Sequence, residues 1–364
     1  MADTPQQQVA IVGCGIIGRT HTDTIAARPD AVVTVLVDPD SEASAALAAR
    51  LKEAGQPAPQ VYDDLGEALS GSPEVTLVAI CTPSGTHAEL AEQAIQAKKH
   101  VVIEKPLDVD LGKARRLGAV AARTASEGLV VSVISQHRFD AGSAVIKQAI
   151  DSGRFGQLTS ATATVAWWRS DEYYASAGWR GTWAQDGGGA LMNQGVHTVD
   201  LMLWFMGRPV IIQAQALRAA HHAIEVEDTV VATLTFETGA VGTLHATTAA
   251  FPGGRTRVAV HGTEGGAEIE DDLLSRLNLD ATKDEAPTDV GDPGGHKAQY
   301  ADILQAIADG GQPAITVQHG IEALATVRAV YIASTLQRPV KFQDVLEGKY
   351  DDVDVSRSVG LPPS

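Results

Sequence analysis

The sequence is poor in cysteine and in positive charge, and it has no long apolar run. Two cysteines, Cys14 and Cys81, are too few for a disulfide framework, and no CxxC or HExxH spacing occurs; we therefore predict two buried reduced thiols and no bound metal. The net charge of −17 argues against nucleic acid and anionic membranes as partners. No stretch of about 18 apolar residues is present, so no transmembrane helix is predicted.

The first residues also lack the basic start and the apolar stretch of a secretory signal, and we therefore expect a cytoplasmic protein.

The 364 residues exceed the usual size of one compact core. We predict a nucleotide-binding domain over residues 1–135, a substrate-binding and oligomerisation domain over 136–345, and a C-terminal tail over 346–364. Whether this tail is an arm on another subunit stays open.

A glycine-rich motif, Gly13-Cys14-Gly15-Ile16-Ile17-Gly18, lies between a predicted strand, Val9 to Val12, and a predicted helix, Ile16 to Arg28. The first glycine permits a tight turn, the second leaves room for a pyrophosphate, and the third lets the helix pack on the strand. The helix N-terminus offers free N–H groups to the phosphates. The motif predicts a dinucleotide-binding turn with cofactor contacts at Gly13, Gly15, Ile16, Ile17 and Gly18.

Asp38 indicates which dinucleotide binds. It ends a second predicted strand, Val32 to Val37, and lies 38 − 18 = 20 residues past Gly18. A carboxylate at this position accepts hydrogen bonds from the hydroxyls of the adenosine ribose and repels a 2′-phosphate. No lysine or arginine stands nearby to hold that phosphate. We therefore predict NAD as the cofactor, in preference to NADP.

Apolar strand-like runs and helical patterns continue to alternate up to residue 134. Buried strands separated by helices form a parallel sheet covered on both faces, so the predicted class is α/β, with an N-terminal doubly wound Rossmann domain. Ligands bind beyond the C-terminal ends of such strands. Thr82, Pro83 and Lys105 follow strand ends and are predicted to share one crevice with the glycine turn.

Lys105 is the first candidate for chemistry, because it follows a buried strand and precedes Pro106. Beside a bound nicotinamide cation, like charge and desolvation would help this lysine to exchange a proton with a substrate hydroxyl. Successive strand residues point to opposite faces, so we expect Glu104 to contact the nicotinamide ribose instead. A solvated surface lysine is the alternative interpretation.

The run from Gly187 to Asp200 is the second candidate. A helix is predicted from Asn193 to Met206, and on it Asn193, His197 and Asp200 fall at i, i+4 and i+7, which places them on one face. His197 could act as an acid or a base. The alternative is a core histidine whose hydrogen bond is satisfied by Asp200.

Aromatic residues make up 5% of the chain but gather in one stretch with two arginines. Aromatic faces stack on sugar rings, and arginine and tyrosine bind hydroxyls or an attached phosphate. We predict substrate contacts at Arg169, Tyr174, Arg180 and Trp183. Trp167 and Trp168 fit ordinary strand packing equally well.

Together these motifs resemble the glucose-fructose oxidoreductase/inositol dehydrogenase/MocA (Gfo/Idh/MocA) family over nearly the whole chain. The resemblance rests on the glycine motif, on Cys81-Thr82-Pro83-Ser84 with His87, on Glu104-Lys105-Pro106, and on the run from Gly187 to Asp200. It implies that Ser84 and His87 also contact the cofactor. It further implies an α+β second domain with a large open, mostly antiparallel sheet, and assembly into a homodimer or homotetramer.

The resemblance implies a dehydrogenase that oxidises a secondary hydroxyl of a sugar, glycoside, anhydrosugar or polyol by hydride transfer to NAD. The catalytic set would be Lys105, His197 and Asn193, and His296 and Tyr300 would approach the substrate. Many polyol dehydrogenases of the family carry aspartate in place of Asn193, which shifts proton transfer toward His197, with Lys105 holding the oxygen or sharing the role. Two alternatives stay open: a glycoside hydrolase or lyase that uses NAD through transient oxidation, and a non-catalytic sensor of sugar or NAD.

Overall fold

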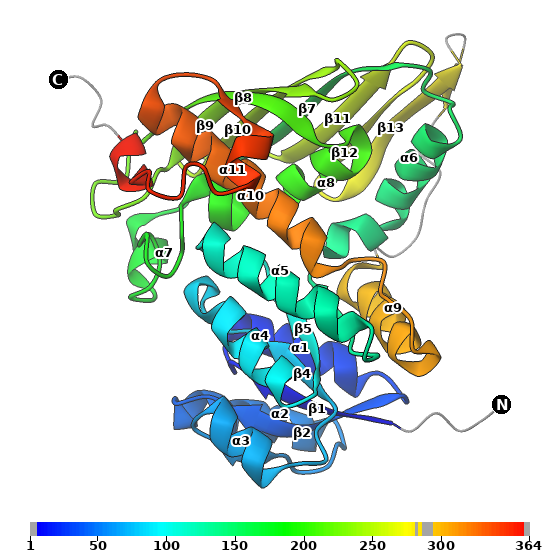
Figure 1. The fold of residues 1–364 in the computed structure, drawn as a ribbon, viewed down its shortest axis with the longest axis vertical. Helices are drawn as coiled ribbons and strands as arrows, with labels where there is room; N and C mark the ends of the chain where they lie inside the picture. The colour runs from blue at the N-terminus through cyan, green and yellow to red at the C-terminus, as the bar shows by residue number, and fades with distance from the viewer. Residues whose placement is uncertain (1–5, 281–282, 286–293, 360–364) are drawn as a thin grey trace. The chain divides into compact units, whose positions relative to one another are not determined.

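The computed structural model describes residues 6–280, 283–285 and 294–359 (Figure 1), so the last five residues of the predicted tail lie outside it. The chain forms two compact units. The first runs to Asp108 and adds Lys113–Ile134 and His296–Gly320, whereas the second holds Val109–Gly112, Ser135–Gly295 and the residues from Ile321 onward. A segment from late in the chain thus belongs to the first unit. The domain limits at residues 135 and 345 stay a prediction.

The first unit is built on a parallel sheet. Within the described residues, six strands pair in the order β3-β2-β1-β4-β5-β6, and every neighbouring pair is parallel. From β1 the next strands along the chain, β2 and β3, are added on one side, and from β4 the strands β5 and β6 are added on the other side. The boundary between β1 and β4 is therefore the topological switch point, where such sheets bind ligands. The predicted doubly wound Rossmann sheet is confirmed. Its strands are β1 (Gln7–Val12), β2 (Ala31–Val37), β3 (Gln60–Tyr62), β4 (Leu77–Ile80), β5 (His100–Ile103) and β6 (Val131–Val133).

Helices connect these strands and complete the core of the first unit. They are α1 (Ile16–Ala26), α2 (Ser41–Glu53), α3 (Leu65–Gly71), the short η1 (Ser84–Thr86), α4 (His87–Gln96), α5 (Leu111–Ala125) and α9 (Gly295–Asp309). Tyr300 and Ile303 of α9 belong to the same buried cluster as Val9 and Ile11 of β1. The late segment is therefore part of this core, and it brings Tyr300 close to the first helix.

The second unit is built on a large, mostly antiparallel sheet, as the resemblance implied. Nine strands of the described chain pair in the order β14-β13-β12-β11-β7-β10-β9-β8-β15, and β7 with β10 is the parallel pair. Helix α8 packs on β7 and β11 (Figure 1). The strands are β7 (Leu158–Ala166), β8 (Pro209–Leu217), β9 (Thr229–Phe236), β10 (Val241–Thr247), β11 (Thr256–Gly262), β12 (Gly266–Glu270), β13 (Leu273–Asp280), β14 (Lys283–Glu285) and β15 (Val340–Lys341).

The helix predicted from Asn193 begins later than expected. A π-helical turn, η3 (Ala190–Gly195), comes first, and α8 covers Val196–Met206. Asn193 therefore lies on the wider π turn, and its assumed i, i+4 relation to His197 on one α-helix is wrong. The remaining elements are η2 (Gln136–Phe139), α6 (Ala141–Asp151), α7 (Asp171–Ala175), α10 (Val317–Leu336), α11 (Phe342–Leu346) and η4 (Val355–Ser358). In the described part of the chain, none of the helices is long and apolar enough to cross a membrane.

Candidate dinucleotide and substrate sites

The glycine turn between β1 and α1 has the shape that a pyrophosphate needs. Gly13 has a φ of +94°, and a Cβ there would lie 2.6 Å from the carbonyl oxygen of Cys81. A Cβ at Gly18 would lie 2.0 Å from the carbonyl oxygen of Gly13, so the helix meets the turn directly. A Cβ at Gly15 would meet nothing within 4 Å. Close packing thus surrounds the turn, while the space over Gly15 is open for a ligand.

The N-terminus of α1 is left without a protein cap. Among the residues that the structure describes, no side chain caps it through a hydrogen bond, and its first turn contains no acidic residue. The Ile16 side chain at this end is 78% exposed, whereas Ile17 is half-buried and packs against the core. Uncapped N–H groups at the positive end of a helix suit a phosphate.

Asp38 is held beside this turn at the end of β2. Its Oδ2 accepts the Cys14 N–H at 2.7 Å, and its Oδ1 accepts the Asp40 N–H at 2.9 Å. Each carboxylate oxygen has a second lone pair, so the group can still accept hydrogen bonds from a ribose. The donors and the charge at this turn therefore fit NAD.

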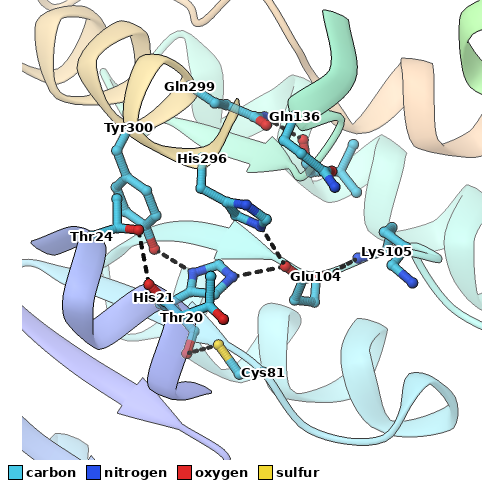
Figure 2. A network of polar contacts seen from close by, with 12 residues as sticks. Thr20, His21, Thr24, Cys81, Glu104, Lys105, Gln136, His296, Gln299 and Tyr300 are labelled. Atoms are coloured by element: carbon cyan, nitrogen blue, oxygen red, sulfur yellow. Dashed lines mark hydrogen bonds and ion pairs between the residues drawn. The ribbon is translucent and has the colours of Figure 1, made fainter. Parts of the chain in front are cut away.

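Glu104 lies at the centre of a buried polar network (Figure 2). His21 of α1 bridges two partners: its Nε2 lies 2.8 Å from Glu104 Oε1, and its Nδ1 lies 2.7 Å from the Tyr300 hydroxyl. His296 Nε2 lies 3.4 Å from the same Oε1. The Lys105 N–H donates to Glu104 Oε2 at 3.0 Å, and the Lys105 side chain extends away from the carboxylate. The network thus ties the backbone of Lys105 to α1 and α9.

The charge of Glu104 follows from these partners. Burial acts to raise the pKa of this carboxyl, but hydrogen bonds from His21 and His296 outweigh burial and hold the pKa well below its usual range. Glu104 is therefore an ionised, buried anchor. Its predicted contact with the nicotinamide ribose stays a prediction, as does the contact of His296 with the substrate.

His87 forms hydrogen bonds with two backbone segments, one that follows β4 and one that follows β5. Its Nε2 lies 2.8 Å from the carbonyl oxygen of Thr82, and its Nδ1 lies 2.8 Å from that of Pro106. The ring is 1% exposed. Thr82, Pro83 and Ser84 are half-buried after β4. These segments follow β4 and β5, where the cofactor contacts are predicted, and His87 links them through its ring.

Two sets of side chains in the described residues have the ligand types of a metal site: His21 with Glu104 and His296, and His137 with Asp140 and Asp272. In each set an imidazole nitrogen lies 2.8 Å from a carboxylate oxygen. Direct hydrogen bonds between the side chains account for both arrangements. The absence of a metal stays a prediction.

In the second unit, Glu227 holds the π turn that carries Asn193. Its carboxylate accepts the N–H groups of Gly189 at 2.8 Å and Leu191 at 2.9 Å, and the Tyr331 hydroxyl at 2.9 Å. A Cβ at Gly189 would lie 1.8 Å from the Glu227 carbonyl oxygen, so a side chain has no room there. Burial raises the pKa of Glu227 to about 7, against these hydrogen bonds. Sequence reasoning missed this residue, although a charged pair, Glu227-Asp228, just before an apolar strand was a visible signal.

Asn193, His197 and Asp200 have different neighbours in the structure. Asn193 Nδ2 donates to Asp186 at 2.7 Å, and the ring of His197 meets that of His137 edge-on at 4.9 Å between centroids. Asp200 accepts two hydrogen bonds from Arg138, at 2.8 and 2.6 Å, in a buried ion pair. Sequence reasoning did not select the η2 segment that supplies His137 and Arg138.

His197 also lines a pocket within the second unit. Trp167 and Gln194 are among its lining residues, and Asp272 and His137 supply polar groups. The full lining is His137, Trp167, Gln194, His197, Thr198, Leu201, Thr256, Arg257, Val258, Ile269 and Asp272. The pocket combines apolar walls with a few polar groups, which is typical of small-molecule sites.

The aromatic stretch divides into core and accessible residues. Tyr174 is buried with Ile224 and Val226, and its hydroxyl meets Thr248 Oγ1 at 2.8 Å. Trp183 Nε1 donates to the Glu225 carbonyl oxygen at 3.1 Å. Tyr173, which sequence reasoning did not select, is half-buried and contacts both Arg169 and Arg180. Substrate contacts by Tyr174 and Trp183 stay a prediction.

Each of the two units matches the model of a known protein family. The model of an oxidoreductase family with an NAD-binding Rossmann fold matches residues 7–135, and that of the GFO/IDH/MocA C-terminal domain matches residues 144–268. The 1,5-anhydro-D-fructose reductase of Ensifer adhaerens is 30% identical over 277 residues, which cover 74% of this chain and 80% of the reductase. The inositol 2-dehydrogenase of Rhizobium meliloti is 27% identical over 264 residues, covering 71% and 74%.

A solved structure extends the similarity over the fold. The WlbA dehydrogenase from Bordetella pertussis, in complex with NADH and UDP-GlcNAcA, superposes with a TM-score of 0.81 at 28% identity. The match covers 92% of this chain and 98% of that protein. The chain therefore belongs to the GFO/IDH/MocA oxidoreductase family, and its first unit is an NAD-binding Rossmann domain.

Proposed function

We propose that this protein oxidises a secondary hydroxyl of a sugar, glycoside, anhydrosugar or polyol. NAD, when bound, supplies the hydride acceptor. The observation that carries the proposal is the pairing of an open glycine turn and Asp38 with a lysine whose backbone is fixed by a buried network. The chain's own task is then to orient the sugar and to move the hydroxyl proton.

Lys105 and His197 are proposed to manage that proton. Lys105 is half-buried at the end of β5, and its backbone N–H is held by Glu104, so its position is restrained before a substrate arrives. His197 borders the pocket of the second unit beside a second histidine, His137. Asn193, held by Asp186, is proposed to orient the substrate, because an amide cannot take the proton.

Several relatives support this substrate class. The names of two relatives, an anhydrofructose reductase and an inositol dehydrogenase, denote reactions at sugar or polyol oxygens. The WlbA structure holds a nucleotide sugar together with NADH. We propose a carbohydrate substrate for this chain on the same grounds.

We also propose that the protein acts in the cytoplasm as a homodimer or homotetramer. Two free, buried thiols suit a reducing compartment. The outer face of the second sheet exposes Val210, Val231 and Val241, at 42%, 53% and 55%, on three neighbouring strands. Apolar side chains gathered on one open sheet face suit contact with a second copy.

The test of the proposed reaction is NADH formation. The purified protein is incubated with NAD and, separately, methyl β-D-glucoside, methyl β-D-glucuronide, α-D-glucose 1-phosphate, myo-inositol and 1,5-anhydro-D-glucitol, and NADH absorbance is followed. We expect at least one sugar to be oxidised. Lys105→Ala should lower turnover about 100-fold or more while leaving the Kd for NAD nearly unchanged, because the amine acts on the proton.

Lys98→Ala serves as the control, since Lys98 is an exposed lysine of the same unit that pairs with Glu127. It should retain full turnover. Wild-type turnover in Lys105→Ala would refute the proposed role of Lys105.

A further inference from the structure

Two arginines of the second unit share one aromatic ring. The guanidinium carbon of Arg169 lies 4.9 Å from the centre of the Tyr173 ring, and that of Arg180 lies 4.5 Å from it. Each arginine also stacks on a tryptophan, Arg169 on Trp167 at 4.8 Å and Arg180 on Trp179 at 4.6 Å. The rings hold both cations in place through cation–π contacts.

Among the described residues, these two arginines lack a carboxylate counterion. In the described part of the chain, neither forms an ion pair with a carboxylate within 4 Å, although the protein carries an excess of acidic residues. The Nε atom of each is buried and has no hydrogen-bond partner there. Two positive charges that share one aromatic ring, each with an unsatisfied buried Nε donor, cost free energy that a bound anion would recover.

Several other arginines in the described part of the chain form ion pairs with carboxylates. Arg138 meets Asp200, Arg28 meets Asp30, and Arg208 meets Glu322. Asp186, which follows Arg180 by six positions, accepts hydrogen bonds from the Gly181 N–H and from Asn193. Arg169 and Arg180 differ from these three arginines, since the described residues give neither of them a carboxylate partner.

Gln194 connects the arginine pair with the pocket beside His197. It donates from Nε2 to the Tyr173 hydroxyl at 2.9 Å, and its Oε1 accepts from Arg169 Nη2 at 3.3 Å. Gln194 and Trp167 both line that pocket. Both arginines are half-buried, so part of each side chain stays accessible to a ligand.

We propose that Arg169 and Arg180 bind an anionic substituent of the substrate, a carboxylate or a phosphate carried by the sugar. The planar guanidinium fork matches both groups and forms paired hydrogen bonds with them. The inference rests on the proposed function and narrows it, because it selects acidic sugars over neutral ones. Tyr173 and Gln194 act as positioning residues that hold the two forks.

The test measures binding by calorimetry to the protein saturated with NADH, so that no oxidation is required. The ligands are methyl β-D-glucuronide for the carboxylate, α-D-glucose 1-phosphate for the phosphate, and methyl β-D-glucoside as the neutral sugar. We expect one anionic ligand to bind about tenfold or more tightly than the neutral one. The ligand that does so identifies which anion the arginines take.

Arg169→Gln and Arg180→Gln should each abolish that preference without weakening the neutral ligand. Arg357→Gln is the matched control, an exposed arginine of the same unit that pairs with Asp354. If a glutamine variant fails to fold, Arg169→Lys and Arg180→Lys replace it; they keep the charge without the fork and should lose part of the preference.

Equal binding of all three ligands, no binding of either anionic ligand, or equal losses in Arg357→Gln would overturn the inference. Its failure is distinct from failure of the proposed function. Anion binding that depends on the arginines, with no sugar oxidised, would leave the anionic subsite standing and reject the dehydrogenase. Oxidation of neutral sugars without any charge preference would reject the anionic subsite and leave the proposed dehydrogenase standing.

Discussion

Asp38 offers a sharp test of cofactor choice. In Asp38→Ala the adenosine ribose loses its charged acceptor, and hydrogen bonds to charged groups contribute about 1.5–3 kcal/mol each. Since every 1.4 kcal/mol corresponds to about tenfold in Kd, the Kd for NADH should rise about 10- to 100-fold. The 2′-phosphate of NADPH would no longer meet a negative charge, so the Kd for NADPH should rise less or fall.

The matched variant Asp38→Asn separates charge from shape. An asparagine oxygen can still accept the Cys14 N–H, which Asp38 Oδ2 accepts at 2.7 Å, so the turn should keep its conformation. We expect Asp38→Asn to weaken NADH binding less than Asp38→Ala, while both reduce the preference over NADPH.

The assay is fluorescence titration with NADH and NADPH, with thermal unfolding of each variant as a check on folding. Glu74→Ala, an exposed acidic residue of the same unit, should leave both affinities unchanged. An unaltered ratio of the two affinities in Asp38→Ala would refute the assignment of Asp38 to the ribose.

Two further predictions concern buried groups. Burial raises the pKa of Glu227 from 4.5 to about 7. Between these pH values the folded protein therefore keeps a proton on Glu227 that the unfolded chain has lost. As the pH rises from 4.5 to 7, the free energy of unfolding should fall by up to about 3 kcal/mol relative to Glu227→Gln. Parallel slopes for the two proteins in denaturant titrations across that pH range would contradict this. His21→Phe leaves the buried Glu104 with fewer partners and should cost about 3 kcal/mol, whereas Tyr300→Phe removes one hydrogen bond and should cost about 1 kcal/mol. Equal melting temperatures for the two variants would show that His21 does not support Glu104.

Local chemistry made the dinucleotide site predictable. The tasks of Gly13 and Gly18 and the position of Asp38 depend on a strand, a turn and a helix that are contiguous in the chain, and the structure has all three. The parallel sheet followed from the same alternation of apolar runs and helical patterns.

Features that depend on distant partners could not be predicted in this way. Glu104 meets His21 and His296, which lie 83 and 192 positions away, and the strand pattern carried no sign of either contact. The π turn escaped notice because its apolar residues suit an α-helix equally well, while the N–H groups that distinguish it are bonded to Glu227. Between the adjacent Tyr173 and Tyr174, packing against Ile224 decided which ring is buried.

The proposed hydride transfer can be followed by the transfer of deuterium from the sugar to the cofactor. Methyl β-D-glucoside and methyl β-D-glucuronide, deuterated at every ring carbon, are incubated with NAD and the protein, and the NADH is analysed by mass spectrometry. We predict that NADH gains one deuterium from whichever sugar is oxidised. NADH that forms without deuterium would contradict it.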